Sequence, residues 1–258
     1  MNDNMDKKDT IAEDENEHTF HTIEARPVEL RSGYDYFGRK WYFKVFTPIL
    51  VFLLKIFVRY LYAPLFLGFR VKNKKILKKH RNQAKIFISN HIHPTDAFLI
   101  GTVIWPKKVY FLMLYTNLGI PFVGKWLRFL GGAPIPTKRS HLQEFQEQLN
   151  DALARGAWVG VYPESSLRPY CDHIRPFKKG AIRFAVDANV GIIPMVFVLR
   201  KPYGLYRLFK RKPLLQLHVL EEYIVDDKGT RFETIDFHTQ NLHNILSEYF
   251  EKHSNIMR

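Results

Sequence analysis

Apolar residues recur along residues 85–258 with the two periods that distinguish strands from helices. Short runs of branched and aromatic residues predict strands over 85–89, 109–114, 158–162, 192–199 and 214–223. Apolar residues at helical spacing predict helices over 140–155, 178–187 and 242–250. Strands that alternate with helices predict an α/β fold, with a mixed, largely parallel sheet flanked by helices.

The chain before residue 85 has a different pattern. Residues 45–54 and 60–69 are charge-free apolar runs of ten residues each, shorter than the roughly 18 residues expected of a membrane-spanning helix. Between them, Lys55 and Arg59 would share one helix face with Tyr62. A basic stripe on an apolar helix is typical of a segment that lies in a membrane interface. A buried helix or helix pair of the core is the alternative.

These patterns predict three parts. Residues 1–32 form an acidic tail that we expect to be disordered, since its first 18 residues are polar and carry seven acids and two lysines. Residues 33–70 form an apolar, membrane-associating helical segment. Residues 71–258 form one domain. The acidic start also lacks the basic and then apolar pattern of a secretory signal.

Charge indicates the kind of partner. The net charge is +14, and the acidic tail carries −5 of the balance, which leaves +19 for the rest. Seven cations within residues 70–81 directly follow the apolar segment. Nucleic acid, a phospholipid surface and a phosphorylated substrate would all suit this charge. Because zinc-finger spacing and ribonucleoprotein motifs are missing, we expect an anionic phospholipid membrane and no nucleic acid.

The first candidate for chemistry is the segment Asn90-His91-Ile92-His93-Pro94-Thr95-Asp96. It follows a predicted strand and precedes a predicted helix, a position where open α/β sheets bind ligands. A neutral His91 could take a proton from a hydroxyl group, and a carboxylate at its other ring nitrogen would orient it. Alternatively, Asp96 could simply favour a helix dipole, and His91 could be structural.

Three further segments are candidates, and the first of them looks like a strand-end loop that faces the same ligand-binding crevice. Residues 161–169 run from a strand into Pro-Glu, Ser165 and Arg168, with more cations at Arg175 and Lys178. Residues 130–139 contain two glycines that permit close approach to a ligand, followed by Lys138 and Arg139; an ordinary turn is the alternative. Residues 191–196 are an apolar strand with a central proline, which suggests an edge or a bulge.

Taken in this order, the four segments resemble the glycerolipid (lysophospholipid) acyltransferase superfamily, which includes the 1-acylglycerol-3-phosphate acyltransferases. The Asn-His-x4-Asp block of that family matches Asn90, His91 and Asp96. Its Phe-Pro-Glu-Gly-Thr-Arg block resembles the segment that begins at Tyr162, and its Pro-Phe-Lys-x-Gly segment resembles residues 176–180. The Ile-Pro block matches residues 193–194.

The resemblance implies an O-acyltransferase without an acyl-enzyme intermediate. His91 and Asp96 would be catalytic, and an acyl-CoA or acyl-carrier protein would donate the acyl group to the hydroxyl of a lysophospholipid, with 1-acylglycerol-3-phosphate as the leading candidate. It implies no cofactor and no metal. We expect substrate binding by Asn90, Glu164, Ser165, Lys138, Arg139, Arg168, Arg175 and Lys178. The protein would be peripheral or monotopic on the cytoplasmic face of a membrane, in phospholipid biosynthesis.

The sequence departs from the family motifs at two positions, and both departures concern recognition of the acceptor head group. Thr137 stands where the family usually has an arginine, and Ser165 stands where it has a glycine. Other classes remain as alternatives: an acyltransferase for another lipid acceptor, a metal-dependent hydrolase that uses His91, His93 and Asp96, and a non-catalytic protein that binds lipid surfaces. The single cysteine, Cys171, excludes a disulfide within the chain.

Overall fold

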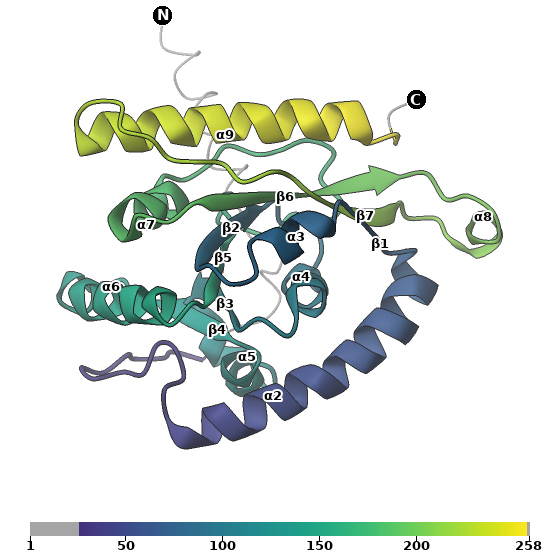
Figure 1. Ribbon diagram of the computed structural model, residues 1–258. Helices are drawn as coiled ribbons and strands as arrows, with labels where there is room; N and C mark the ends of the chain where they lie inside the picture. The colour runs from purple at the N-terminus through teal and green to yellow at the C-terminus, as the bar shows by residue number, and fades with distance from the viewer. Residues whose placement is uncertain (1–25, 257–258) are drawn as a thin grey trace, which may run out of the picture.

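The computed structural model describes residues 26–256, in which seven strands form one sheet (Figure 1). The strand order is β1-β7-β6-β2-β5-β3-β4. The strands are β1 (Arg70–Lys72), β2 (Lys85–Ser89), β3 (Val109–Leu114), β4 (Gly132–Ile135), β5 (Trp158–Val161), β6 (Ile192–Arg200) and β7 (Leu214–Val219).

Five neighbouring strands run in one direction. β2 pairs in parallel with β5 and β6, and β3 pairs in parallel with β5 and β4. β7 is antiparallel to β6, and β1 is parallel to β7. The predicted mixed, largely parallel sheet is therefore confirmed. The carboxyl ends of the five parallel strands meet at one side of the sheet, which we call the carboxyl edge.

β2 and β3 have the bounds that the sequence predicts, because each is built on an apolar run, residues 86–88 in β2 and 109–114 in β3. For residues 191–196 the expectation of an edge strand is wrong, since β6 lies between β2 and β7. Pro194 lies between the Ile192–Tyr223 bridge and the β6–β7 ladder, which begins at Met195. Its missing N–H group therefore falls where the antiparallel pairing is interrupted.

The glycine segment before Thr137 forms a strand rather than a turn. Gly131 has a φ of +91°, and a Cβ atom there would lie 2.6 Å from the carbonyl oxygen of Val109. A Cβ atom at Gly132 would lie 2.9 Å from Sδ of Met113. The two glycines thus allow β4 to approach β3 closely, and the contact they serve is within the protein.

Helices cover both faces of the sheet. α7 and α9 lie on one face, whereas α4 and α5 lie on the other (Figure 1). Thr230 and Glu233 form a capping box that starts α9. The helices after β1 are α3 (Lys75–Lys79), α4 (Asp96–Ile104), η2 (Tyr115–Gly119, a 3₁₀ helix), α5 (Gly124–Phe129), α6 (Arg139–Ala154), α7 (Gly180–Ala188), α8 (Tyr206–Phe209) and α9 (Arg231–His253).

The apolar N-terminal segment forms one continuous helix, from α2 (Trp41–Lys55) into the π-helical η1 (Ile56–Leu67). It spans 27 residues with a mean hydropathy of 1.9 in its most apolar stretch, so its length and composition would suffice to cross a membrane. The helix extends beyond each charge-free run, because it continues through the predicted basic stripe at Lys55 and Arg59. Both are half-buried, and Nζ of Lys55 lies 3.6 Å from the ring centroid of Trp105.

The face of this helix that points away from the domain carries exposed apolar side chains. Buried residues such as Val58 and Ala63 face the domain, where the helix contacts α4 and α5. The outward face is a continuous line of exposed apolar residues, which we call the apolar stripe. It consists of Trp41, Val45, Phe46, Ile49, Phe52, Leu53, Ile56, Phe57, Tyr60, Leu61, Leu65 and Phe66.

Residues before the helix also belong to the core. The ring of Phe37 lies 5.0 Å from that of Tyr110, and the ring of Tyr36 lies 5.3 Å from that of Phe145. Residues 1–25 of the predicted tail lie outside the described residues. The division at residues 32 and 70 stays a prediction, but the chain on both sides of the helix packs into one core.

We predict that His218 makes stability depend on pH. It is fully buried on β7, with its ring nitrogens 3.0 Å from the Tyr249 hydroxyl and 3.0 Å from Oε1 of Gln216. Burial, aided by nearby cations including Lys72, lowers its pKa from 6.5 to about 4. The folded state therefore holds it neutral, and stability is present above pH 6.5 and is lost as the pH falls towards about 4.

Urea unfolding in detergent should show a loss of roughly 1–2 kcal/mol between pH 7 and pH 5 that His218→Gln removes. If the variant and the natural chain have the same pH dependence, His218 is not its source.

Candidate active site

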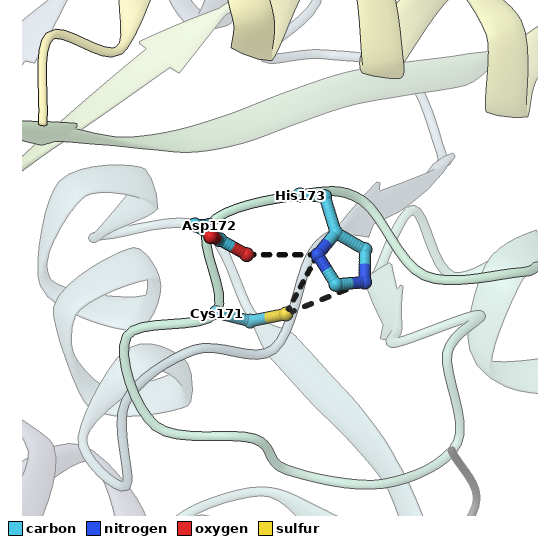
Figure 2. A group of neighbouring side chains, drawn as sticks. All are labelled: Cys171, Asp172 and His173. Atoms are coloured by element: carbon cyan, nitrogen blue, oxygen red, sulfur yellow. Dashed lines mark hydrogen bonds and ion pairs between the residues drawn. The ribbon is translucent and has the colours of Figure 1, made fainter. Parts of the chain in front are cut away.

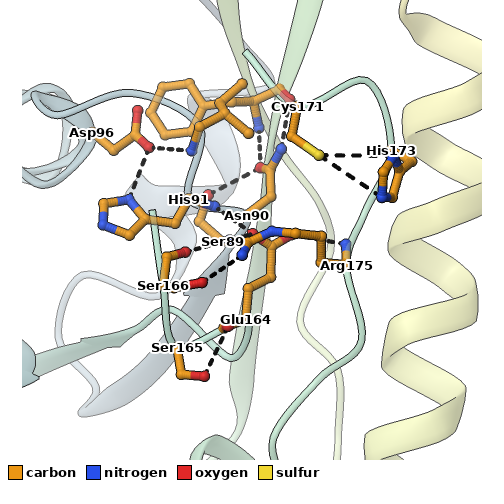
Figure 3. Close-up of polar contacts among 12 residues, drawn as sticks. Ser89, Asn90, His91, Asp96, Glu164, Ser165, Ser166, Cys171, His173 and Arg175 are labelled. Carbon is orange, nitrogen blue, oxygen red and sulfur yellow. Dashed lines mark hydrogen bonds and ion pairs between the residues drawn. The ribbon is translucent and has the colours of Figure 1, made fainter. Parts of the chain in front are cut away.

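His91 and Asp96 meet at the carboxyl edge. His91 follows the end of β2, and Asp96 is the first residue of α4. Nδ1 of His91 lies 3.2 Å from Oδ2 of Asp96 (Figure 3). The Asp96 side chain is fully buried, whereas the His91 side chain is 23% exposed. The predicted pair is therefore in contact, with the imidazole accessible from outside.

The loop between the two residues folds around the carboxylate. Oδ2 of Asp96 also accepts hydrogen bonds from the backbone N–H groups of Ile92 (2.8 Å) and His93 (2.9 Å). These donors stabilise an ionised carboxylate. An ionised Asp96 favours the tautomer in which Nδ1 of His91 carries the proton, and this leaves Nε2 to accept one.

Tyr162 forms one wall of the site. It directly follows β5, and its ring stacks on the His91 imidazole with centroids 4.2 Å apart and planes at 18°. Burial and the charge of Asp96 raise the pKa of Tyr162 well above its usual range, so the phenol stays neutral. Its hydroxyl has no hydrogen-bond partner among the described residues. The sequence predicts no role for this ring, although its place directly after a strand is a usable signal.

Glu164 and Arg175 form a buried ion pair beneath His91. Oε2 of Glu164 lies 2.8 Å from the Arg175 guanidinium and accepts a hydrogen bond from the backbone N–H of His91 at 3.1 Å (Figure 3). Oε1 accepts from the backbone N–H of Arg175 at 3.1 Å. The guanidinium also donates to Oγ of Ser166 at 2.5 Å. Because both charges are only 2% exposed, they face each other and the loops, and their expected contact with substrate stays a prediction.

Asn90 is also directed into the protein. It is fully buried, its Nδ2 donates to the carbonyl of Phe197 at 3.0 Å, and its Oδ1 accepts from the N–H of Phe197 at 2.8 Å. This side chain continues the pairing of β2 with β6 past the end of the strand. In this arrangement Asn90 fixes the backbone that leads into His91.

The exposed residues of the predicted site separate into two places. Arg168 and Lys178 lie on the loops around the pair, since their backbone N–H groups donate to the carbonyls of His91 (3.1 Å) and Pro163 (2.7 Å). Lys138 and Arg139 follow β4, which is three strands from β2, or about 14 Å along the sheet. Nζ of Lys138 lies 3.2 Å from Oε1 of Glu29.

Ser165 has a φ of +60°, in the left-handed region that favours glycine. This explains why the resembling family has glycine here. Ser165 is exposed, and its hydroxyl donates to the carbonyl of Glu164 at 2.8 Å. The departure from the motif therefore keeps the loop conformation and adds a hydroxyl group at the surface of the site.

One group of side chains could hold a metal ion among the described residues: Cys171, Asp172 and His173 (Figure 2). Sγ of Cys171 lies 3.8 Å from Nδ1 of His173, and Oδ1 of Asp172 lies 2.8 Å from the same nitrogen. Burial raises the pKa of the Cys171 thiol. The group does not include His91, His93 or Asp96, whose side chains instead bond within their own loop.

The chain is similar to known acyltransferases. The family described as Acyltransferase matches residues 68–198, just over half of the chain. A 1-acyl-sn-glycerol-3-phosphate acyltransferase of Chlamydomonas reinhardtii is 32% identical over 116 residues, and one of Saccharomyces cerevisiae is 32% identical over 119. These alignments cover 44% and 43% of this chain, and the chain spans about a third of the length of each relative (33% and 37%).

The chain belongs to the acyltransferase family. Its fold is similar to that of the 1-acyl-sn-glycerophosphate (LPA) acyltransferase PlsC from Thermotoga maritima, with a TM-score of 0.57 over 82% of both chains at 18% identity. Together with the exposed apolar helix, the family indicates that the protein associates with a membrane.

We predict that Arg175→Met destabilises the fold by about 3–5 kcal/mol, because it leaves the buried Glu164 carboxylate unpaired. Arg168→Met, at an exposed position in the same loop, is the matched control and should leave stability within about 0.5 kcal/mol. Urea unfolding in detergent measures both. A stable Arg175→Met variant with a raised KM for the lipid acceptor would show that Arg175 binds substrate instead.

Proposed function

We propose that this protein is an O-acyltransferase that moves a fatty acyl group from acyl-CoA or acyl-carrier protein to the hydroxyl of a lysophospholipid, in phospholipid biosynthesis. The contact between Nδ1 of His91 and Oδ2 of Asp96, at the carboxyl edge, carries the proposal. Family membership supports it. 1-Acylglycerol-3-phosphate is the proposed acceptor for two reasons. The relatives are named 1-acyl-sn-glycerol-3-phosphate acyltransferases, and the cations Arg168 and Lys178 lie on the loops around the site.

The proposed reaction uses one general base. Nε2 of His91 accepts the proton of the acceptor hydroxyl while the oxygen attacks the thioester carbonyl carbon. Asp96 stays ionised and stabilises the imidazolium. When the C–S bond breaks, the imidazolium returns the proton to the departing thiolate, so the products are an acylated lipid and a free thiol. The chain needs no cofactor and no metal for these steps.

The proposed attachment is monotopic, on the cytoplasmic face. A crossing helix would place its two ends on opposite sides of about 30 Å of hydrocarbon. Here Phe37, before the helix, and β1, after it, join the same domain. The helix also contacts α4 and α5 (Figure 1). The side chains of the apolar stripe are exposed. This arrangement suits a helix that lies within one leaflet.

We predict that His91→Ala lowers kcat by at least about a thousandfold, because the general base is lost, while vesicle binding is unchanged. Thiol release should be measured over a panel of lysophospholipids with acyl-CoA and acyl-carrier protein. His93→Ala is a control for loop disturbance and for the metal alternative. Retained activity in His91→Ala would refute the mechanism, and inhibition by a chelator would favour a metal-dependent one.

We also predict that both ends of the apolar helix lie on one side of the membrane. Lys40→Cys and Lys75→Cys place exposed thiols before and after it, and the native Cys171 is 6% exposed. An impermeant maleimide should label both positions in inside-out vesicles and neither in intact cells. Labelling of the two positions from opposite sides would show a crossing helix.

A further inference from the structure

The connection between β6 and β7 carries a second apolar surface beside the site, where Nζ of Lys212 lies 5.3 Å from the ring centroid of Tyr170. Residues 201–212, which we call the α8 loop, leave the sheet at the carboxyl edge and contain α8 at their tip (Figure 1). Leu205, Leu208 and Phe209 are 76%, 82% and 63% exposed. Apolar side chains that gather at a protruding tip mark an interaction surface.

The α8 loop continues the apolar stripe. The Tyr206 hydroxyl donates to the carbonyl of Pro64, and Nζ of Lys210 donates to the carbonyl of Phe66. Pro64 and Phe66 are in the last turns of η1, where the stripe ends with Leu65 and Phe66. The tip of the loop is therefore held against the end of the helix that we propose to lie in the membrane.

The charge around the tip is uniformly positive. Residues 201–212 contain five cations and no acidic residue. At the base of the loop, Arg70, Lys72 and Arg200 line a cavity of about 380 Å³ together with Tyr203. Among the described residues, these three cations have no carboxylate within ion-pair distance. A cationic collar around apolar side chains fits a surface of anionic head groups above hydrocarbon.

We propose that the α8 loop is a second membrane-contact element, which inserts Leu205, Leu208 and Phe209 into an anionic bilayer while Arg70, Lys72 and Arg200 bind head-group phosphates. This inference rests on the proposed membrane attachment of the helix. The continuity with the stripe and the excess of cations select a bilayer over a second copy of the chain, which would bring like charges together.

The first test is sedimentation of the full chain with vesicles of phosphatidylcholine alone or with added phosphatidylglycerol. Leu208→Ser/Phe209→Ser should lower the partition coefficient at least about tenfold on both kinds of vesicle. The matched control is Ile224→Ser/Phe232→Ser, which removes one aliphatic and one aromatic residue of similar exposure (63% and 65%) outside the loop. Arg70→Gln/Arg200→Gln should weaken binding to the anionic vesicles selectively.

The outcomes separate the two proposals. If the natural chain does not bind vesicles, the attachment by the helix fails as well. A second outcome would refute the loop proposal alone. In it, the natural chain binds vesicles, the stripe variant Phe46→Ser/Phe57→Ser does not, and the loop variant binds as well as the natural chain. Equal losses in the loop variant and its control would also refute it. Normal vesicle binding with lost transfer to a soluble short-chain acceptor would assign the loop to the active site instead.

A depth probe supplies an independent measurement. Leu208→Cys and Ile224→Cys can each carry an environment-sensitive fluorophore, because the native Cys171 is buried. With anionic vesicles, the probe at position 208 should shift to shorter wavelength and be quenched by lipids with a quencher on the acyl chain. The probe at position 224 should do neither. An unshifted, unquenched probe at position 208 would overturn the proposal.

Discussion

The site depends on the hydrogen bonds and the ion pair that the buried Glu164 carboxylate makes. This carboxylate is 2% exposed and must find donors inside the protein, because an unpaired buried charge costs several kcal/mol. It finds them in the backbone of His91, the backbone of Arg175 and the Arg175 guanidinium. These donors belong to the loop after β2 and to the chain after β5. One carboxylate therefore fixes the relative position of both loops that surround the proposed catalytic pair.

Asp96 fixes the His91 imidazole in a similar way. Two backbone N–H groups hold its Oδ2 before the histidine adds a third donor, so its geometry does not depend on substrate. The stacked ring of Tyr162 restricts the other degree of freedom, rotation of the imidazole plane. Asn90 secures the end of β2 through Phe197 on β6. The base is thus preorganised by contacts with three of the parallel strands or the loops that follow them.

Sequence patterns predict β2 and β3 well because both contain apolar runs, and every residue of β2 is buried. They miss β4, whose glycines and proline resemble a turn, because only the contact with β3 shows why glycine is needed. The His91–Asp96 pair is local in sequence and could be predicted. The bond between Glu164 and Arg175 could not, because carboxylates and arginines near each other in sequence are as often separate surface charges as partners.

The contact between η1 and α4 has a consequence for where chemistry takes place. α4 begins with Asp96, so the helix proposed to rest in the leaflet packs directly on the helix that carries the proposed catalytic carboxylate. The height of the imidazole above the lipid is then set by the fold itself. An enzyme built in this way samples its acceptor in two dimensions, and its rate follows the mole fraction of that lipid in the surface rather than its concentration in the surrounding water.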